Sequence, residues 1–396
     1  EIFTFILLRC NMNSEYQRRR LLKIIAGGIL SIMGGLFGAT NNLVKSKKTR
    51  KSMKINKTSI LSKISLPETG PWPTEDPFLF CVHHNDDYPA AKDDLSPNIP
   101  LSGRNLGNDF SNKDGWSMYH GQKIPGFPRH PHRGFETLTV VSKGFIDHAD
   151  SLGASARYGD GDAQWLTAGD GINHSEMFPL FNQNGNNKLD FFQIWLNLSS
   201  YNKRVEPNFE MYWEDDIPKI SSNLNGDKNV QVEIITGDYL NFSSPIAPKN
   251  SWASNKKNDV SVWIIRLDRN GKFAIPNTKS GAKRNLYILK GSNMQIDGQS
   301  ISGGSMVTLD SSKNTVIKNL GSKTKILMLQ GVPINEPVVK YGPFVMNTRL
   351  EIEQAFYDYN RTEFGGWKWG ISDPTHGTEP EKFAKLISGK IIKPRK

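Results

Sequence analysis

The stretch His130–Val141, HPHRGFETLTVV, decides the fold. It joins a His-Pro-His triplet to the β-branched run Thr137–Val141, and the pair Lys143-Gly144 then predicts a turn. Residues i and i+2 of a strand project from the same face, so His130 and His132 can reach one point inside a barrel. Proline lacks the N–H that a central strand needs, so Pro131 predicts an edge strand or a bulge.

A second pair of ligand-type residues has the same spacing, His174 and Glu176 in the run NHSE. On strands of one barrel, the two pairs would bring three imidazoles and one carboxylate to a single point. One His-x-His motif in a loop is more often a surface accident, but two such motifs in one strand-rich block indicate a metal site. Cys10 and Cys81 lie far apart and provide neither a disulfide framework nor a thiolate site.

Short strand-like runs separated by Gly, Asn and Asp surround these motifs and predict a sandwich or barrel rather than a parallel α/β fold. In the run FFQIWLNL, Phe192, Ile194, Leu196 and Leu198 share one face, and Phe191, Gln193, Trp195 and Asn197 share the other. A second block holds the candidate strands Val260–Asp268, Leu286–Leu289, Met306–Leu309 and Lys325–Leu329. The near-helical spacing within Arg349–Tyr359 predicts a terminal helix, which we expect to pack on the second barrel.

The net charge of +11 comes from the N-terminal part of the chain. Residues 1–63 contain 13 Lys and Arg and two acidic residues, and the remainder contains 37 of each sign. A neutral body lacks the basic face that phosphate binding needs, so we expect no nucleic-acid partner.

The N-terminal residues have the pattern of a targeting segment. We interpret residues 1–11 as an upstream translation artefact, since Met12 opens a plausible start, and residues 41–65 as a basic linker. In residues 12–40, the run Arg18–Lys23 (RRRLLK) precedes the apolar stretch Ile24–Ala39 and resembles a twin-arginine export signal. This resemblance implies a periplasmic protein. A cytoplasmic protein or an N-terminal membrane anchor is the alternative, with membrane contact only through this segment if it is uncleaved.

Several segments together resemble the pirin family of cupins, in its bacterial branch. They are HPHRGFETLTVV, GFIDHADSLG, DAQWLTAGDGINHSEMFP, FFQIWLNL, Glu206-Pro207, GPFVMNT at 342–348, HHNDDYP at 83–89 and FGGW at 364–367. They stand in the family's order from about Pro77 to about Ala384 and so cover essentially the whole body.

The resemblance implies an all-β fold of two tandem cupin barrels with a short C-terminal helical segment. We place the N-terminal metal-binding cupin at residues 66–240 and a metal-free C-terminal cupin, with the terminal helix, at 241–396. The implied metal ligands are His130, His132, His174 and Glu176. Glu136 fits the first Glu of the general cupin pattern and competes with Glu176, but pirins use the second motif's Glu. We expect Glu136 to be structural or to support the ligands, and His148 to be packed or at a pocket rim.

Three nitrogens and one oxygen suit one divalent ion, Fe(II), Mn, Co, Ni, Cu or Zn, and the resemblance implies iron. Four protein ligands leave two octahedral positions, enough for O2 and an oxygen of a small aromatic substrate. Four aromatic residues near the motifs could line a slot for a flat ligand, although core packing is the more frequent role: Phe135, Trp165, Phe178 and Trp195.

Three functions follow from the resemblance, and fold alone does not choose among them. We favour a quercetin 2,3-dioxygenase-like oxidoreductase, in which Glu176 doubles as metal ligand and catalytic proton acceptor. The alternatives are a non-enzymatic metal- or redox-responsive protein that modulates a protein partner, and a metal-binding cupin with an unrelated small substrate.

Export in the folded state is a prediction of this sequence. The metal ligands come from distant parts of the chain, so the barrel must fold before it holds an ion loaded in the cytoplasm. Replacing Arg18 and Arg19 by Lys should trap the precursor in the cytoplasm, whereas blocking the general secretion pathway should leave export unchanged. Cell fractionation with immunoblotting measures both, and uncleaved wild-type protein wholly in the cytosol would contradict the signal interpretation.

Overall fold

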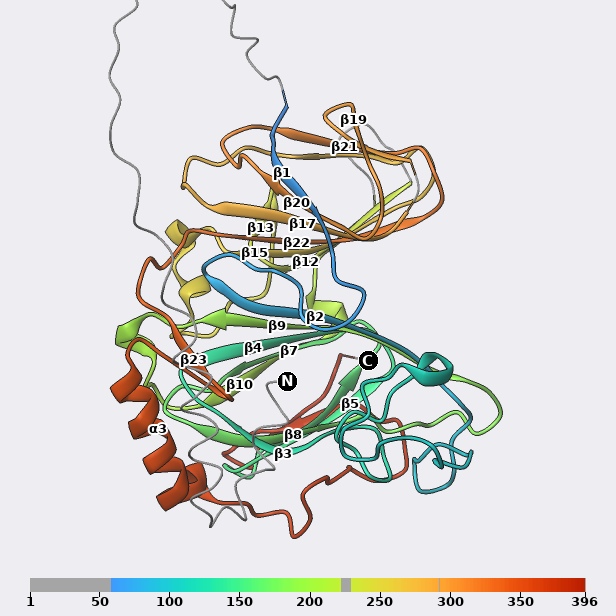
Figure 1. Ribbon diagram of the computed structural model, residues 1–396, viewed down its shortest axis with the longest axis vertical. Coiled ribbons are helices and arrows are strands. Elements are labelled where there is room, and N and C mark those ends of the chain that lie inside the picture. The colour runs from blue at the N-terminus through green and yellow to red at the C-terminus, as the bar shows by residue number, and fades with distance from the viewer. Residues whose placement is uncertain (1–57, 222–228, 292, 396) are drawn as a thin grey trace, which may run out of the picture. The chain divides into compact units, whose positions relative to one another are not determined.

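Antiparallel strands build two tandem barrels in the computed structural model, which describes residues 58–221, 229–291 and 293–395 (Figure 1). This confirms the predicted all-β fold. The predicted segments 1–11 and 12–40, and most of 41–65, lie outside the described residues. Among the described residues, no helix combines the length and the hydropathy needed to cross a bilayer.

The first barrel consists of two facing sheets. One has the strand order β10-β7-β4-β9-β2, with β2 (Phe78–Tyr88), β4 (Phe135–Lys143), β7 (Ala163–Thr167), β9 (Asn187–Asn197) and β10 (Asn208–Tyr212). The other has the order β26-β25-β6-β5-β8-β3, with β3 (Gly126–His132), β5 (Phe145–Asp150), β6 (Ser155–Gly159), β8 (Ile172–Met177), β25 (Phe383–Lys385) and β26 (Ile391–Ile392).

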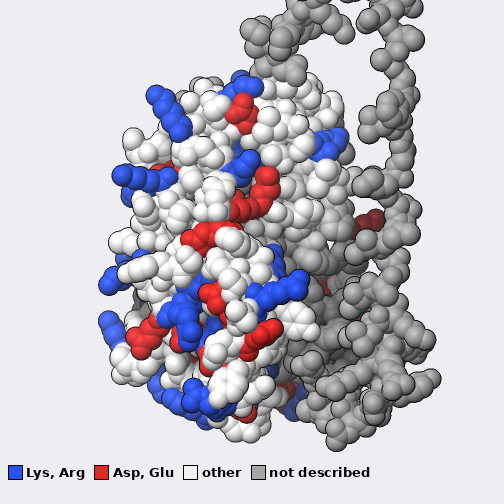
Figure 2. Space-filling view, turned by 60° about the vertical axis from the view of Figure 1, so that its left-hand side comes forward, with Lys and Arg blue, Asp and Glu red and all other residues white. Residues whose placement is uncertain are grey.

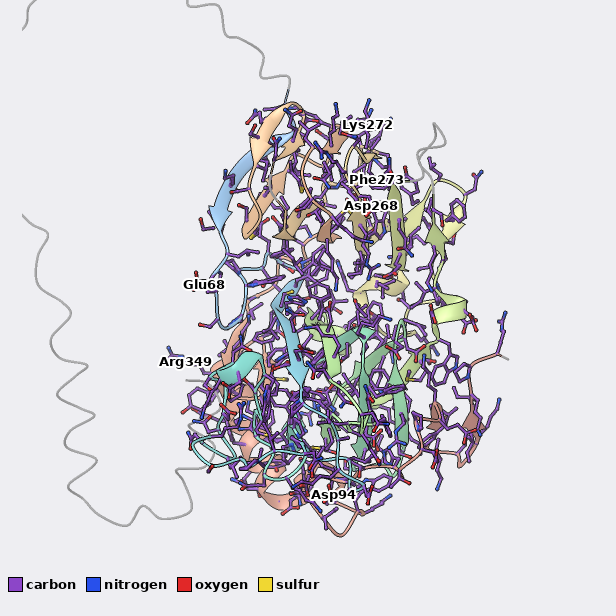
Figure 3. All side chains as sticks on the ribbon, turned by 90° about the vertical axis from the view of Figure 1, so that its right-hand side faces the viewer. Glu68, Asp94, Asp268, Lys272, Phe273 and Arg349 are labelled. Atoms are coloured by element: carbon purple, nitrogen blue, oxygen red, sulfur yellow. The ribbon has the colours of Figure 1, made fainter. Side chains whose placement is uncertain are left out.

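The second barrel also has two sheets. The larger has the order β1-β20-β17-β22-β15-β12-β11, with β1 (Ile60–Ser65), β11 (Lys219–Ile220), β12 (Val230–Thr236), β15 (Ser261–Leu267), β17 (Lys283–Lys290), β20 (Ser305–Leu309) and β22 (Thr324–Gly331). The smaller has the order β16-β21-β18-β19, with β16 (Lys272–Ile275), β18 (Met294–Ile296), β19 (Gln299–Ile301) and β21 (Thr315–Asn319). Side chains alternate between core and surface, as with buried Phe273 and exposed Lys272 of β16 (Figure 3).

Three short elements complete the described fold. They are the hairpins β13 (Asp238–Tyr239) with β14 (Phe242–Ser243) and β23 (Val339–Tyr341) with β24 (Phe344–Met346), and the helix α3 (Arg349–Thr362). A capping box starts α3, in which Thr348 and Glu351 bond each other's backbone N–H. On one face of the molecule, basic and acidic side chains are interspersed (Figure 2).

The predicted alternation of β9 is confirmed, and it shows where the two cores lie. Phe192, Ile194 and Leu196 belong to an apolar cluster that also contains Val262 and Leu327 of the second barrel. Phe191, on the opposite face, belongs to the core of the first barrel. The outer face of one sheet is therefore buried between the barrels, and its inner face looks toward the site described below.

The turn after β4 also follows the prediction. Gly144 has φ +83, and a Cβ there would lie 2.6 Å from the carbonyl oxygen of Lys188. Only glycine fits this close approach without displacing the backbone. The β-branched strand therefore ends where the sequence indicated.

The boundaries between the parts differ from the predicted ones. β1 (60–65) pairs with β20, so these residues form a strand of the second barrel rather than the end of a linker. β11 and β12 also belong to the second barrel's sheet, so this barrel begins at about residue 219 rather than 241. Both β11 and β12 lie before the predicted boundary at residue 241, and their pairing within the second barrel's sheet sets the boundary instead.

The terminal helix is present as predicted, but its expected place on the second barrel is wrong. Arg133 of the first barrel donates from Nη1 to Asp358 of α3 at 2.8 Å, and its guanidinium lies over the Phe364 ring. A Cβ on Gly171 would lie 2.6 Å from that same ring. β25, which follows α3 in the chain, also packs on the first barrel, because it pairs with β6. Each end of the described chain thus packs on the barrel that is distant from it in sequence.

The buried pair of Arg133 and Asp358 predicts a large stability effect. Asp358→Ala should lower the free energy of unfolding by roughly 2 kcal/mol, because Arg133 Nη1 loses its charged partner while Asp170 remains 3.2 Å from Nη2. Glu353→Ala, at an exposed site of the same helix, should change it by less than about 0.5 kcal/mol. Urea denaturation followed by circular dichroism measures both, and equal losses would contradict this docking.

Candidate metal centre

Two neighbouring strands of the first barrel carry three histidines. β3 holds His130 and His132, β8 holds His174, and the antiparallel register pairs His130 with His174. The ring centroids are 4.8 Å apart for His130–His132, 4.4 Å for His130–His174 and 5.0 Å for His132–His174. One ligand nitrogen from each ring lies within 4.8 Å of the others. The three imidazoles that the motifs predicted to converge therefore do converge.

The proline between the two β3 histidines has the environment that it requires. β3 is the edge strand of its sheet, and its register with β8 shifts between Phe127 and His130. An edge strand leaves one row of backbone groups outside the ladder, so the missing N–H of Pro131 costs little. The prediction of an edge strand or a bulge is confirmed on both counts.

Burial keeps the three imidazoles neutral. It lowers the pKa of His130 to about 4, and it lowers the pKa values of His132 and His174 well below 6.5, with the neighbouring imidazoles adding to the effect. His130 Nδ1 donates to the carbonyl oxygen of Pro128 at 2.9 Å, which leaves the lone pair of the neutral ring on Nε2. Neutral rings with lone pairs are the form that binds a metal.

The hydrogen-bond inventory supports a bound ion. Within the described part of the chain, neither ring nitrogen of His174 has a hydrogen-bond partner, and neither does Nδ1 of His132. Buried polar atoms without partners are rare and costly. A divalent ion would satisfy such nitrogens, and the three-imidazole set fits one.

Glu176 lies beside this cluster. Its Oε2 is 3.9 Å from His174 Nε2, and the residue is 3% exposed. Gln193 Nε2 donates to Oε2 at 2.9 Å, and Thr139 Oγ1 lies 3.3 Å from Oε1. Burial raises the pKa of Glu176 to about 7, against the opposing effects of His148 and these two donors. Its carboxylate lies beside His174 but outside the group of three imidazoles whose ligand atoms lie within 4.8 Å of one another, and its role as ligand stays a prediction.

Glu136, the competing carboxylate, points elsewhere. It accepts hydrogen bonds from Thr167 Oγ1 at 2.8 Å and from Ser251 Oγ at 2.6 Å. Its neighbour Phe135 contacts the His132 ring, with centroids 5.0 Å apart. Since side chains alternate along β4, Phe135 faces the histidines and Glu136 faces away from them.

Two polar residues near Glu176 were missed as site residues, Gln193 and Thr139. The sequence did hold a signal for Gln193, a lone amide between Phe191 and Trp195 on one face of a strand. Thr139 had no signal of its own, because β-branched residues are ordinary in strands. His148 is buried as expected, with Nε2 3.1 Å from Asp150 Oδ2, and its ring centroid is 5.5 Å from that of His174.

The four aromatic residues near the motifs divide into two groups. Phe135 and Trp195 contact His132, the Trp195 ring at a centroid distance of 5.5 Å. Trp165 belongs to the apolar layer between the barrels, and Phe178 belongs to the first barrel's core. Only the first two can therefore contribute to a wall beside the histidines.

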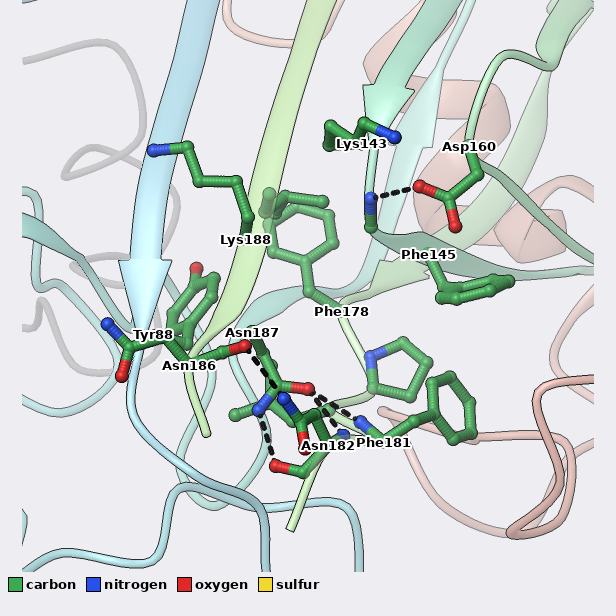
Figure 4. A pocket seen from close by; sticks show the side chains of 14 residues that line it. Tyr88, Lys143, Phe145, Asp160, Phe178, Phe181, Asn182, Asn186, Asn187 and Lys188 are labelled. Atoms are coloured by element: carbon green, nitrogen blue, oxygen red, sulfur yellow. Dashed lines mark hydrogen bonds between the residues drawn. The ribbon is translucent and has the colours of Figure 1, made fainter. Parts of the chain in front are cut away.

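A cavity of about 260 Å³ lies elsewhere in the first barrel, lined by residues that include Tyr88, Lys143, Phe178 and Lys188 (Figure 4). None of the three histidines lines it. Its polar groups serve the local fold, since the Asp160 carboxylate accepts from the Gly144 N–H at 3.1 Å. This cavity and the histidine cluster are therefore separate places in the described part of the first barrel.

Two tandem barrels with an imidazole cluster in the first define a bicupin that fits a divalent metal ion. The chain belongs to the pirin family: the family's profile described as Pirin matches residues 94–196, and the profile described as Pirin C-terminal cupin domain matches residues 262–365. The resemblance inferred from the motifs is thereby confirmed.

Individual relatives agree with this assignment. A Pseudomonas aeruginosa protein, whose name assigns it provisionally to the quercetin 2,3-dioxygenases, is 31% identical over 243 residues, covering 61% of this chain and 80% of the relative. Human pirin is 31% identical over 253 residues, covering 62% and 80%. A solved structure of quercetin 2,3-dioxygenase from Acinetobacter baumannii shares the fold, with a TM-score of 0.60, 24% identity, and coverage of 78% of this chain and 99% of that one.

Metal content is the first test of the site. Purified protein should hold about one divalent ion per chain, and His130→Ala or His174→Ala should lose it, because each removes one of three imidazoles. Mass spectrometry of metals measures the content, and circular dichroism checks that the fold persists. Two tightly bound ions per chain, or full retention in the double variant, would contradict a single site.

The two carboxylates provide a matched comparison within this test. Glu176→Gln should weaken metal binding roughly tenfold or more, whereas Glu136→Gln should leave it near the wild-type value. The opposite order would mean that Glu136 is the ligand.

Proposed function

We propose that this protein is a dioxygenase that uses one divalent metal ion, iron(II), to oxidise a quercetin-like flavonol or another aromatic, enolic substrate with O2. The observation that carries the proposal is the buried cluster of three neutral imidazoles with the Glu176 carboxylate beside it. Three nitrogens with one oxygen, and no sulfur, suit a redox-active ion such as Fe(II) with open coordination positions.

The pattern of exposure supports an approach route for a flat substrate. β2 and β3 are the edge strands of the two sheets of the first barrel. On this side, Phe80, Gln193, Phe127 and His130 keep partial exposure, as do Val82, Pro128 and Arg129 beside them. Phe80 packs on Trp195 with centroids 4.7 Å apart, and Phe127 lies 6.3 Å from the His130 ring. One ring beside the most accessible imidazole, and the Trp195 ring beside His132, suit an aromatic ligand.

Glu176 is the candidate proton acceptor. Its carboxylate lies 3.9 Å from His174 Nε2, beside the position where a metal-bound substrate would react. A substrate hydroxyl that reaches a Glu176 oxygen would pass its proton to the carboxylate. A bound redox-active ion would supply the electrons that activate O2, and the barrel would shield the reacting oxygen from bulk water.

Oxygen uptake tests this proposal. The Fe(II)-loaded protein should consume O2 in the presence of quercetin. Chelation of the metal or Glu176→Gln should reduce the rate by about 100-fold or more, because the first removes the redox centre and the second the base. Glu136→Gln is the control and should keep most of the activity.

A failure would also be informative. If every metal form is inert while flavonols still bind, the enzymatic proposal is wrong and a metal-dependent binding function gains support. Flavonol binding to the Zn(II) form, followed by fluorescence quenching, separates these outcomes, because Zn(II) is redox-inert.

A further inference from the structure

Two neutral side chains contact the carboxylate of Glu176 on the side formed by β4 and β9, and Gln193 is the donor to it. Gln193 Nε2 donates to Oε2 at 2.9 Å, and Thr139 Oγ1 lies 3.3 Å from Oε1. A glutamate side chain has three rotatable bonds, so its carboxylate must be fixed if it is to face a metal ion reproducibly. These contacts are the ones that limit its rotation about the terminal bond.

The amide of Gln193 can hold Glu176 in only one of its two orientations. With Nε2 toward Glu176 it donates a hydrogen bond, and with Oε1 toward Glu176 two acceptors would face each other. Thr139 Oγ1 lies 2.5 Å from Gln193 Oε1. A hydroxyl has a single proton to donate, and the shorter distance assigns that proton to Gln193 Oε1 rather than to Glu176. The acceptor-only carboxylate requires Nε2 on its side, and the Thr139 hydroxyl supports this orientation by donating to Oε1.

We propose that Gln193, held in one orientation by Thr139, is the positioning residue that keeps the Glu176 carboxylate turned toward the three imidazoles. The inference rests on the proposed function in one respect, since it takes Glu176 as the fourth metal ligand. It adds two residues that act on the metal through Glu176 and do not touch the ion: Thr139 orients the Gln193 amide, and Gln193 orients the Glu176 carboxylate.

The packing around Gln193 makes this role separable from a structural one. Gln193 is half-buried on an inward face between Phe191 and Trp195, which are buried. In the register of β2 with β9 it pairs with Val82, which is also half-buried. The flanking aromatic residues supply the apolar packing here, so replacement of the amide by an apolar side chain should leave the fold intact.

The first experiment compares two glutamines of the same sheet. In the Co(II)-loaded full chain, Gln193→Leu should raise the metal dissociation constant about 10- to 100-fold and alter the Co(II) absorption spectrum, because the carboxylate loses its fixed orientation. Gln164→Leu is the matched control: Gln164 pairs with Thr139 across the sheet and is 1% exposed, but its amide donates to Met211 Sδ at 3.7 Å and not to Glu176. It should leave both the constant and the spectrum unchanged. Chelator competition measures the constant.

The second experiment tests the role of Thr139 through the amide. Thr139→Val keeps the shape and removes the hydroxyl, so the amide can turn and metal binding should weaken about tenfold. Thr139→Ser should restore wild-type binding, because it returns the hydroxyl without the methyl group. Thr137→Val, on the same face of β4 and outside this set of hydrogen bonds, should have no effect.

The outcomes separate this inference from the dioxygenase proposal, because metal binding is measured without turnover. If the wild-type protein has no activity but the Gln193 and Thr139 variants bind the metal more weakly than it does, the positioning role is supported and the dioxygenase proposal is contradicted. Wild-type metal binding and an unchanged spectrum in Gln193→Leu, with loss in Glu176→Gln, would overturn the positioning role. Wild-type metal binding in Glu176→Gln would also overturn the positioning role of Gln193, since Glu176 would then not be a metal ligand.

Discussion

The antiparallel pairing of β3 with β8 is the interaction on which the rest of the site depends. Its register places His130 opposite His174, and the two-residue period of a strand then puts His132 and Glu176 on the same side. A slip of either strand by one residue would turn that strand's two ligand-type side chains to the outer face. The irregularity between Phe127 and His130, at the edge of the sheet, lets a proline stand between two ligand-type residues without breaking the ladder.

Burial gives these residues their chemistry. Removal from water disfavours charge, so it lowers the pKa values of the imidazoles and raises that of the carboxylate. The same burial leaves ring nitrogens of His174 without hydrogen bonds in the described residues, which is costly unless a ligand satisfies them. A site on two rigid strands also keeps its geometry better than a site on loops. The stability lost in burying these groups is consistent with a function at this point.

The C-terminal segment braces the site from outside. Arg133 follows His132 directly and binds Asp358, and Asn173 precedes His174 and donates to the carbonyl oxygen of Glu363. Both are the outward-facing neighbours of inward-facing histidines, because side chains alternate along a strand. The exchange of terminal segments between the barrels therefore does more than extend two sheets. It fixes the backbone on both strands that carry the imidazoles.

The sequence by itself determined the strands, the convergence of the histidines and the existence of the terminal helix. These features depend on neighbours along the chain, through the two-residue period, the β-branched runs and the capping box of Thr348 and Glu351. Only the tertiary structure decided that Glu136 faces away from the histidines. The two residues between β3 and β4 break the alternation, so Phe135 rather than Glu136 lies on the same side as His132. The tertiary structure alone also decided that α3 packs on the first barrel, and that Gln193 and Thr139 meet Glu176. A periodic pattern shows that a face is buried, but the surface that covers it comes from a segment far away in the sequence.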